Sequence, residues 1–297
     1  MPVFKPDEFF ASTDKKEISH KLTSEGKTAH IIAGGTGFYE LAKRGYIPEV
    51  KTVVSIMKLG LDYIKEEPGH FEIGATTTLQ SLLESKMGTG DGLEAIKDAL
   101  REIRPVQVRN VATIGGEICI SVPVVDLPTA LLACDTTIRI ASENDGYESK
   151  LEDFYIDAFL TKLKYGEFVK EVLVPKKPSI VHSAFVKIGR TAYDFNLINC
   201  GVQISLNSSK SIESLRVVLG GIKRTPFRSE DFEKKLLGKI PDESSIRDAV
   251  ESEFSKARLL PSVHGSSKYK LALLPVVLRD CIMKAYNRSL NGQVVAK

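Results

Sequence analysis

The amino-acid sequence predicts an α+β protein that folds as two domains. Three observations support this: a strand–turn–helix–strand pattern between residues 28 and 57, further strands mixed with helices up to residue 174, and a change of composition after Lys176-Lys177-Pro178. That tripeptide is expected to be a linker, because lysines and a proline offer little to bury. We expect one domain over 1–177, with lobes of about 1–57 and 58–177, and a second over 178–297.

The first lobe is expected to be organised around a glycine turn. Residues 28–33 form an apolar strand that runs into Gly34-Gly35-Thr36-Gly37, and a helix over 38–44 and a strand over 52–57 follow. Gly45 is placed to end that helix. A strand, a tight turn and a helix in this order present backbone N–H groups to an anion.

The other elements are predicted from apolar periodicity and capping residues. Thr76-Thr77-Thr78 precedes one helix, and Pro275 lies inside the last helix, where it is expected to kink the helix or shift its start. The remaining strands are expected over 61–66, 71–75, 136–141, 147–151, 168–174, 184–188, 197–206 and 212–219, and the remaining helices over 79–85, 92–103, 231–237, 245–257 and 268–286.

A second glycine turn contains Gly115 and Gly116, and it precedes a possible helix cap at Asp126. Paired glycines let the backbone approach a ligand closely, and successive N–H groups in such a turn can form a nest for phosphate oxygens. Asp126 stands just before Leu127-Pro128, an order that suits a helix N-terminus. The two turns together indicate a site for a phosphate-containing ligand.

Two better-known phosphate-binding motifs are absent. The glycines at 34–37 do not form GxGxxG, so the Rossmann fingerprint is not met. Gly26-Lys27-Thr28 matches the end of a P-loop, but the first glycine of that motif would fall at Lys21, and the match precedes its strand. The anion site is therefore expected to be of another kind.

Bulk composition favours a soluble protein without metal clusters of its own. A net charge of +3 does not imply non-specific binding to nucleic acid or membranes, and no apolar run reaches the length of a membrane span. The first residues lack the apolar core of a signal peptide, so a cytoplasmic location is expected. No metal-ligand spacing occurs among the cysteines, and the histidines form no cluster; the cysteines are Cys119, Cys134, Cys200 and Cys281.

On these motifs the chain resembles the FAD-binding medium subunit of the molybdenum hydroxylases, which include carbon monoxide, xanthine and aldehyde dehydrogenase-like complexes. The family pattern Ala-Gly-Gly-Thr is found at 33–36. The pattern Arg-Asn-Val-x-Thr-Ile-Gly-Gly-Asn is found at 109–116, with Glu117 in place of the last residue. The resemblance continues through nearly the whole chain, at Ser121 to Pro128, Phe185 to Arg190 with Asp194, Gly220 to Arg228, and Ser267 to Lys270.

The resemblance implies a two-lobed FAD-binding domain of the vanillyl-alcohol oxidase-like type and a C-terminal domain of a three-stranded sheet with a helix bundle. The FAD diphosphate would lie between the two glycine turns, Lys187 would approach the flavin ring, and Asp126 would accept hydrogen bonds from the ribityl chain or nearby backbone. The implied cofactor-binding set is Ile32, Ala33, Gly34, Gly35, Thr36, Gly37, Thr113, Gly115, Gly116, Glu117, Cys119, Asp126, Val169 and Lys187, with no catalytic residue and no metal ligand.

Each assignment competes with a purely structural role. Gly34-Gly35 can be only a strand-to-helix turn, Asp126 only a helix cap, and Lys187 with Arg190 solvated charges on an edge strand. Tyr193 and Phe195 either flank the flavin ring or belong to the core, as aromatic residues more often do.

Three positions depart from the family pattern. Glu117 stands where the family has asparagine, which places a carboxylate beside a site meant for a diphosphate. Gly37 replaces a residue that is commonly polar or acidic. Lys270 replaces an arginine and loses its planar fork of donors. These departures bear on the affinity for FAD and leave the expected fold unchanged.

The function implied by the resemblance is that of an electron-transfer flavoprotein subunit. Electrons would come from a [2Fe–2S] small subunit, after substrate oxidation on a molybdopterin large subunit, and pass to an external acceptor, in a dimer of heterotrimers. No cysteine group matches the inserted [4Fe–4S] loop of one subfamily. Two rival functions are a self-contained FAD oxidoreductase of the same superfamily, whose second domain would bind substrate, and a scaffold that binds no flavin. Members of that superfamily with covalently bound flavin need a histidine or cysteine near the flavin, and Cys119 is close to the second turn.

Overall fold

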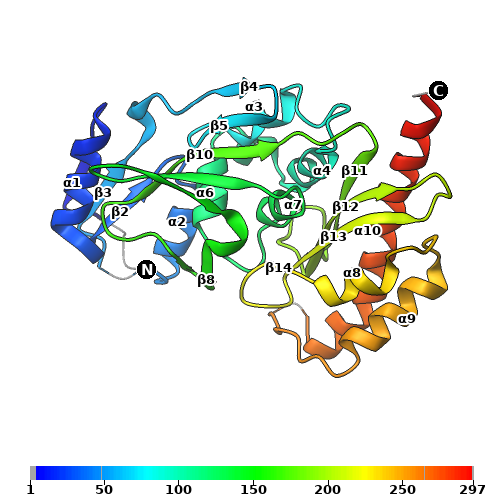
Figure 1. The fold of residues 1–297 in the computed structure, drawn as a ribbon. Coiled ribbons are helices and arrows are strands. Elements are labelled where there is room, and N and C mark those ends of the chain that lie inside the picture. Colours follow the sequence, from blue (N-terminus) through cyan, green and yellow to red (C-terminus); the bar gives the residue numbers. More distant parts are fainter. Residues whose placement is uncertain (1–4, 48, 264, 296–297) are drawn as a thin grey trace. The chain divides into compact units, whose positions relative to one another are not determined.

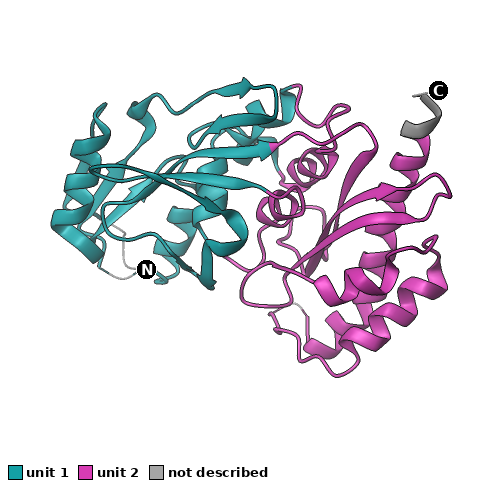
Figure 2. Ribbon diagram, viewed as in Figure 1, with its two compact units in different colours: residues 1–85, 105–121, 136–174 teal, residues 86–104, 122–135, 175–297 magenta. Residues whose placement is uncertain are grey.

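The computed structural model describes residues 5–47, 49–263 and 265–295. The chain divides into two compact units (Figure 2): residues 1–85, 105–121 and 136–174 form unit 1, and residues 86–104, 122–135 and 175–297 form unit 2. Two helices from the N-terminal half, α4 (Glu94–Glu102) and α7 (Leu127–Ala133), therefore belong to unit 2, where they pack on its sheet. The domain boundary expected between residues 177 and 178 stays a prediction. The compact units follow the chain differently, because unit 2 combines segments from both sides of that boundary.

Unit 1 begins with a parallel three-stranded sheet in the order β1-β3-β2 (Figure 1). The predicted strand, turn, helix and strand are present as β2 (Ala29–Ile32), α2 (Thr36–Lys43) and β3 (Thr52–Ser55). Gly45 follows the helix with φ +75°, as predicted. Strand β1 (Glu8–Ala11) and helix α1 (Lys15–Glu25) were not predicted. Both are polar or short, and only their packing beside β3 reveals them.

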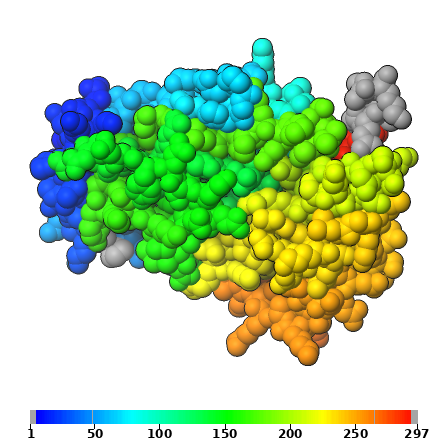
Figure 3. Space-filling model, viewed as in Figure 1, coloured from blue at the N-terminus to red at the C-terminus, as the bar shows by residue number. Residues whose placement is uncertain are grey.

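The rest of unit 1 is a five-stranded sheet in the order β4-β5-β10-β6-β7, with short helices around it. Its strands are β4 (Ile64–Glu66), β5 (His70–Gly74), β6 (Thr137–Ala141), β7 (Tyr147–Lys150) and β10 (Phe168–Pro175), and a separate hairpin is formed by β8 (Tyr155–Asp157) and β9 (Leu160–Thr161). The helices are α3 (Leu79–Glu84), α5 (Val106–Arg109) and α6 (Ile114–Cys119). The green segment around residue 150 covers much of the visible face of unit 1 (Figure 3).

Unit 2 is an antiparallel sheet, β11-β12-β13-β14, packed against helices. The three predicted strands are β11 (Val181–Ile188), β12 (Ile198–Leu206) and β13 (Ile212–Gly220), and a two-residue strand, β14 (Phe227–Arg228), was not predicted. The predicted helices are α8 (Glu230–Leu236), α9 (Glu243–Phe254) and α10 (Ser267–Val295). Helix α10 runs through Pro275 without a break in its assignment, so the proline did not shift its start. No helix in the described ranges is long and apolar enough to cross a membrane.

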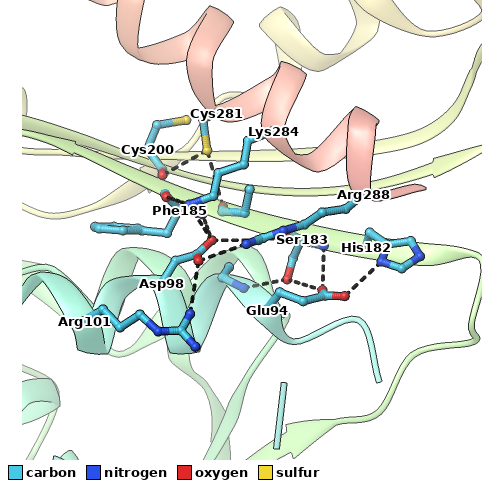
Figure 4. Close-up of polar contacts among 12 residues, drawn as sticks. Glu94, Asp98, Arg101, His182, Ser183, Phe185, Cys200, Cys281, Lys284 and Arg288 are labelled. Carbon is cyan, nitrogen blue, oxygen red and sulfur yellow. Dashed lines mark hydrogen bonds and ion pairs between the residues drawn. The ribbon is translucent and has the colours of Figure 1, made fainter. Parts of the chain in front are cut away.

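A buried carboxylate, Asp98, ties α4 to β11 and α10 in unit 2 (Figure 4). Arg288 donates to both of its oxygens, at 2.7 and 3.0 Å, and Lys284 Nζ lies 3.0 Å away. Burial by itself would raise the pKa of Asp98, but Arg288 and Lys284 hold that pKa below its ordinary value. Glu94, one turn earlier, accepts from His182 and from Ser183. These pairs connect α4 to β11 and α10 within unit 2, beside the buried apolar residues of α4.

Candidate functional site

Both glycine turns line one cavity of about 440 Å³ in unit 1. Its volume is within the range of about 300–1,000 Å³ that is typical of small-molecule sites. Of the predicted cofactor-binding residues, those lining the cavity are Ile32, Ala33, Gly34, Gly35, Thr36, Gly37, Thr113, Gly115, Gly116, Glu117, Cys119 and Val169. The other two, Asp126 and Lys187, belong to unit 2.

The first glycine turn presents unpaired backbone donors at the start of α2. Gly35 is the N-cap of the helix and has φ +74° and ψ −7°, a left-handed conformation that disfavours any residue with a Cβ. Within the described ranges, the N–H groups of residues 34–37 make no hydrogen bond to the protein. Four donors at the positive end of a helix form a cradle for an anion.

Two glycines of this turn also permit close packing against the second. A Cβ on Gly34 would lie 1.9 Å from the carbonyl oxygen of Val111, and one on Gly37 would lie 2.1 Å from Cδ1 of Ile120. Both distances are far shorter than any real contact. At Gly37 the close atom is the end of a flexible side chain, so a larger residue there requires Ile120 to change its conformation, whereas at Gly34 the close atoms belong to the backbone.

The second glycine turn differs from its prediction, because Gly115 and Gly116 lie in the first turn of helix α6 and their N–H groups are already bonded. Ile114 N–H donates to Thr77 O at 3.0 Å, and Gly115 N–H to Ala75 O at 2.9 Å. Gly116 N–H donates to Oγ1 of Thr113, the N-cap residue, at 3.2 Å. The predicted nest of free N–H groups is thus absent here, and tertiary and capping bonds take its place.

His30 and Glu117 are polar residues in the cavity wall. Nε2 of His30 and the hydroxyl of Tyr155 are buried without a hydrogen-bond partner among the described residues. Burial lowers the pKa of His30, which favours the neutral ring at neutral pH. Glu117 is a lining residue. Burial is the largest cause of the raised pKa of Tyr155, and the negative charge of Glu117 adds to it. An unpartnered imidazole nitrogen beside free backbone donors is typical of a ligand site.

The residues present fit the diphosphate of a dinucleotide. Backbone N–H groups can bind phosphate oxygens without a charged side chain, and no lysine or arginine belongs to the described lining of the cavity. Apolar side chains make up most of the remaining wall, which suits the rings and ribose of such a ligand. Burial raises the pKa of the Cys119 thiol to about 12, so this lining cysteine is un-ionised at neutral pH and is a poor nucleophile for covalent attachment of a flavin.

Asp126 and Lys187 form a buried ion pair in unit 2. Lys187 Nζ lies 2.9 Å from Oδ2 of Asp126, and each side chain is only 6% exposed. Asn196 and Asn199 donate to the other carboxylate oxygen at 3.0 and 2.9 Å. Burial raises the pKa of Asp126, although Lys187 and the two amides favour the ionised form. Asp126 stands at the N-cap of α7 but its side chain makes no capping bond, so a role as a side-chain cap is wrong, and Lys187 is not a solvated edge charge.

Exposure and hydrogen bonding define the roles of further residues in unit 2. Tyr193 and Phe195 are 71% and 66% exposed, so neither belongs to the core of this unit. Arg190 is exposed and pairs with Asp194 at 3.2 Å. Lys270 is buried and donates to Gly221 O at 2.6 Å, which needs one donor and no planar fork.

Several residues that line the cavity were not predicted from the sequence, and most of them are apolar. They include His30, Leu41, Tyr46, Ile47, Ile56, Phe159 and Leu163. Their spacing carries no ligand signal, because an apolar residue in a cavity wall and one in the core look the same in a sequence.

Comparison with known families identifies both halves of the chain. Residues 7–177 match the family described as the FAD binding domain in molybdopterin dehydrogenase, and residues 183–285 match the CO dehydrogenase flavoprotein C-terminal domain. The first match covers more than half of the 297 residues.

Individual relatives match over nearly their whole length. The glyceraldehyde dehydrogenase medium chain of Sulfolobus acidocaldarius is 28% identical, over 96% of this chain and 99% of that protein. The carbon monoxide dehydrogenase medium chain of Hydrogenophaga pseudoflava is 24% identical, over 95% and 97%. Among solved structures, a chain of reconstituted CO dehydrogenase from Oligotropha carboxidovorans superposes with a TM-score of 0.89, at 23% identity over 97% of this chain and 100% of that chain. The fold is shared.

Proposed function

The chain belongs to the family of FAD-binding domains of molybdopterin dehydrogenases, and on that premise we propose that it is the electron-transfer flavoprotein subunit of such an oxidoreductase complex. It would take electrons from a [2Fe–2S] subunit and pass them to an external acceptor. A molybdopterin large subunit would oxidise the substrate, in a dimer of heterotrimers. FAD supplies a group that both accepts and releases electrons. The relatives described above are named medium chains, which supports partners of larger and smaller size.

The observation that carries the proposal is the set of unpaired N–H groups at Gly34 to Gly37, inside the cavity of unit 1. We assign the FAD diphosphate to these donors. The second glycine turn, with Thr113, Gly115 and Gly116, would form a wall of the same site without offering free donors. Asp126 and Lys187 stay predicted neighbours of the flavin ring, with the lysine charge already balanced by Asp126.

The four cysteines agree with a partner that holds the iron–sulfur clusters. Cys119 lies in α6, Cys134 follows α7, Cys200 lies in β12 and Cys281 in α10. Among the described residues, no three His, Cys, Asp or Glu side chains come together as a group that could hold a metal ion. The electrons would therefore come from another chain.

The test of the diphosphate assignment is a charge substitution in the first turn. Thr36 is the first residue of α2, where an aspartate favours the helix through its dipole but repels a diphosphate. Thr36→Asp should weaken FAD binding at least about tenfold without lowering the urea midpoint. Thr36→Asn, which has nearly the same shape and no charge, is the control. Flavin absorbance is followed with the chain alone and with its iron–sulfur subunit. Equal affinity for the two variants would contradict the assignment.

Electron transfer needs a separate measurement. The FAD-loaded chain is mixed with the reduced iron–sulfur subunit, and bleaching of the flavin absorbance is followed in a stopped-flow instrument. The proposal expects bleaching at a rate that depends on complex formation. A stable complex whose flavin stays oxidised would contradict it. The absence of FAD binding in both the lone chain and the complex would instead favour the flavin-less scaffold, for which Glu117 in the cavity wall is the supporting feature.

A further inference from the structure

Two exposed aromatic rings, Tyr46 and Phe159, stack on each other in the wall of the cavity in unit 1. Their ring centroids are 5.5 Å apart and their planes differ by 14°. Both line the cavity, yet Tyr46 is 60% exposed and Phe159 48%. Aromatic surface left open to solvent beside a cavity is typical of a surface that a planar ligand covers.

The backbone holds Phe159 in a conformation that non-glycine residues rarely adopt. Its φ is +63°, in the turn between β8 and β9, and Ser121 has φ +47°. Phe159 N–H donates to Ser121 O at 2.8 Å, and Ser121 Oγ donates to Asp157 O at 2.9 Å. Left-handed backbone at a bulky residue costs free energy and persists where the surroundings fix it, often at ligand sites.

Tyr46 is fixed by the end of the same helix that carries the unpaired N–H groups. After α2, Gly45 N–H donates to Ala42 O at 3.0 Å and Tyr46 N–H to Leu41 O at 2.9 Å. These two bonds, with Gly45 at φ +75°, form a Schellman motif. Helix α2 therefore presents donors for phosphate at its start and an aromatic ring at its end.

The residues around Tyr46 and Phe159 favour a ligand ring that carries no charge. Leu41, Ile47 and Leu163 line the cavity, and its described lining includes no lysine or arginine. A flavin ring gains negative charge on reduction, and a nearby cation favours that state. Adenine stays neutral and needs only apolar contact and stacking. The cavity of unit 1 is thus better suited to the adenine end of FAD than to its flavin end.

We propose that Tyr46 and Phe159 hold the adenine ring of FAD by stacking, and that the strained turn at Phe159 positions this surface before the cofactor binds. The proposal rests on the assignment of the diphosphate to residues 34–37. It places both aromatic residues in direct contact with the cofactor, and it makes Ser121 a positioning residue that acts through Phe159.

The decisive variant is Phe159→Gly, because it removes the ring and also relieves the positive φ. If Phe159 had a merely structural role, its substitution would lower the stability of the protein and its affinity for FAD together. The proposal instead expects the urea midpoint to stay the same or rise, while binding of FAD and of ADP each weakens about tenfold, the effect of one lost stacking contact. Tyr46→Leu, which keeps an apolar side chain, should weaken both about fivefold. Phe9→Leu, at a 66% exposed position in β1 that does not line the cavity, is the matched control.

Competition against FAD on the full chain, alone and with its iron–sulfur subunit, separates this proposal from the diphosphate assignment. Inorganic pyrophosphate has no adenine, so Phe159→Gly should leave its inhibition constant unchanged, whereas Thr36→Asp should weaken pyrophosphate, ADP and FAD alike. Weaker FAD binding with unchanged ADP binding would place the flavin ring on the pair and overturn the proposal. Failure of ADP to compete with the wild-type chain, or affinities unchanged by Phe159→Gly, would overturn it as well.

Discussion

The two glycine turns look alike in the sequence, but their backbone N–H groups are used differently in the structure. In the first, the N–H groups of Gly34 to Gly37 have no partner among the described residues and lie at the start of an eight-residue helix. In the second, the N–H groups of Ile114, Gly115 and Gly116 are bonded to Thr77, Ala75 and Thr113. One turn can bind an anion, and the other joins two parts of unit 1. A glycine pair in a sequence therefore predicts that another group lies close to the backbone, but it does not predict whether that group is a ligand or another part of the protein.

The largest effect on stability is expected where the two glycine turns pack against each other. Gly34→Ala places a Cβ 1.9 Å from Val111 O, and backbone on both sides leaves little room to relax. We expect a loss of about 3 kcal/mol in the free energy of unfolding, measured by urea denaturation. Gly69→Ala is the control, because a Cβ there meets no atom within 4 Å and φ is not positive. An equal midpoint for the two variants would show that the turns do not pack as described.

Substitutions in the second glycine turn should change the stability of the protein more than its affinity for FAD. Gly115→Ala brings a Cβ to 2.8 Å from Ala75 O, and we expect about 1–2 kcal/mol of destabilisation. At Gly116 the nearest atom is Oγ1 of Thr113 at 3.1 Å, so Gly116→Ala should change stability by no more than about 1 kcal/mol, the difference in helix propensity. Both folded variants should bind FAD within about twofold of wild type. A large loss of FAD affinity in Gly116→Ala at full stability would mean that this turn also contacts the diphosphate.

The smallest expected effect concerns the carboxylate at Glu117, beside the second turn. Glu117 lines the cavity, where its negative charge opposes a diphosphate. Glu117→Gln keeps the size of the side chain and removes the charge. We expect FAD to bind about threefold more tightly, with the difference shrinking as salt is added. The dissociation constant at low and high ionic strength is the measurement, and tighter binding by the charged wild-type chain would contradict this electrostatic role.

The first turn was largely predictable from the sequence. The apolar run 28–33, the glycines at 34–37 and the helix stop at Gly45 are local signals, and each acts within a few residues. Thr78 as the cap of α3 was predicted for the same reason, and its Oγ1 accepts from Ser81 N–H at 3.1 Å. Local hydrogen bonding and backbone sterics determine such features, and both depend on residues close together in the sequence.

Tertiary packing decided what the sequence left open. The N–H groups of the second turn are bonded to Ala75 and Thr77, some 40 residues earlier, and no local pattern encodes that. Asp126 had the sequence of a helix cap, but Lys187 and Asn199 bind its carboxylate, because β11 and β12 pack against α7. The stacking of Tyr46 on Phe159 joins residues more than a hundred positions apart. The sequence thus determined the family, the two folds and the first glycine turn, whereas the partners of each polar group depended on which segments the fold brought together.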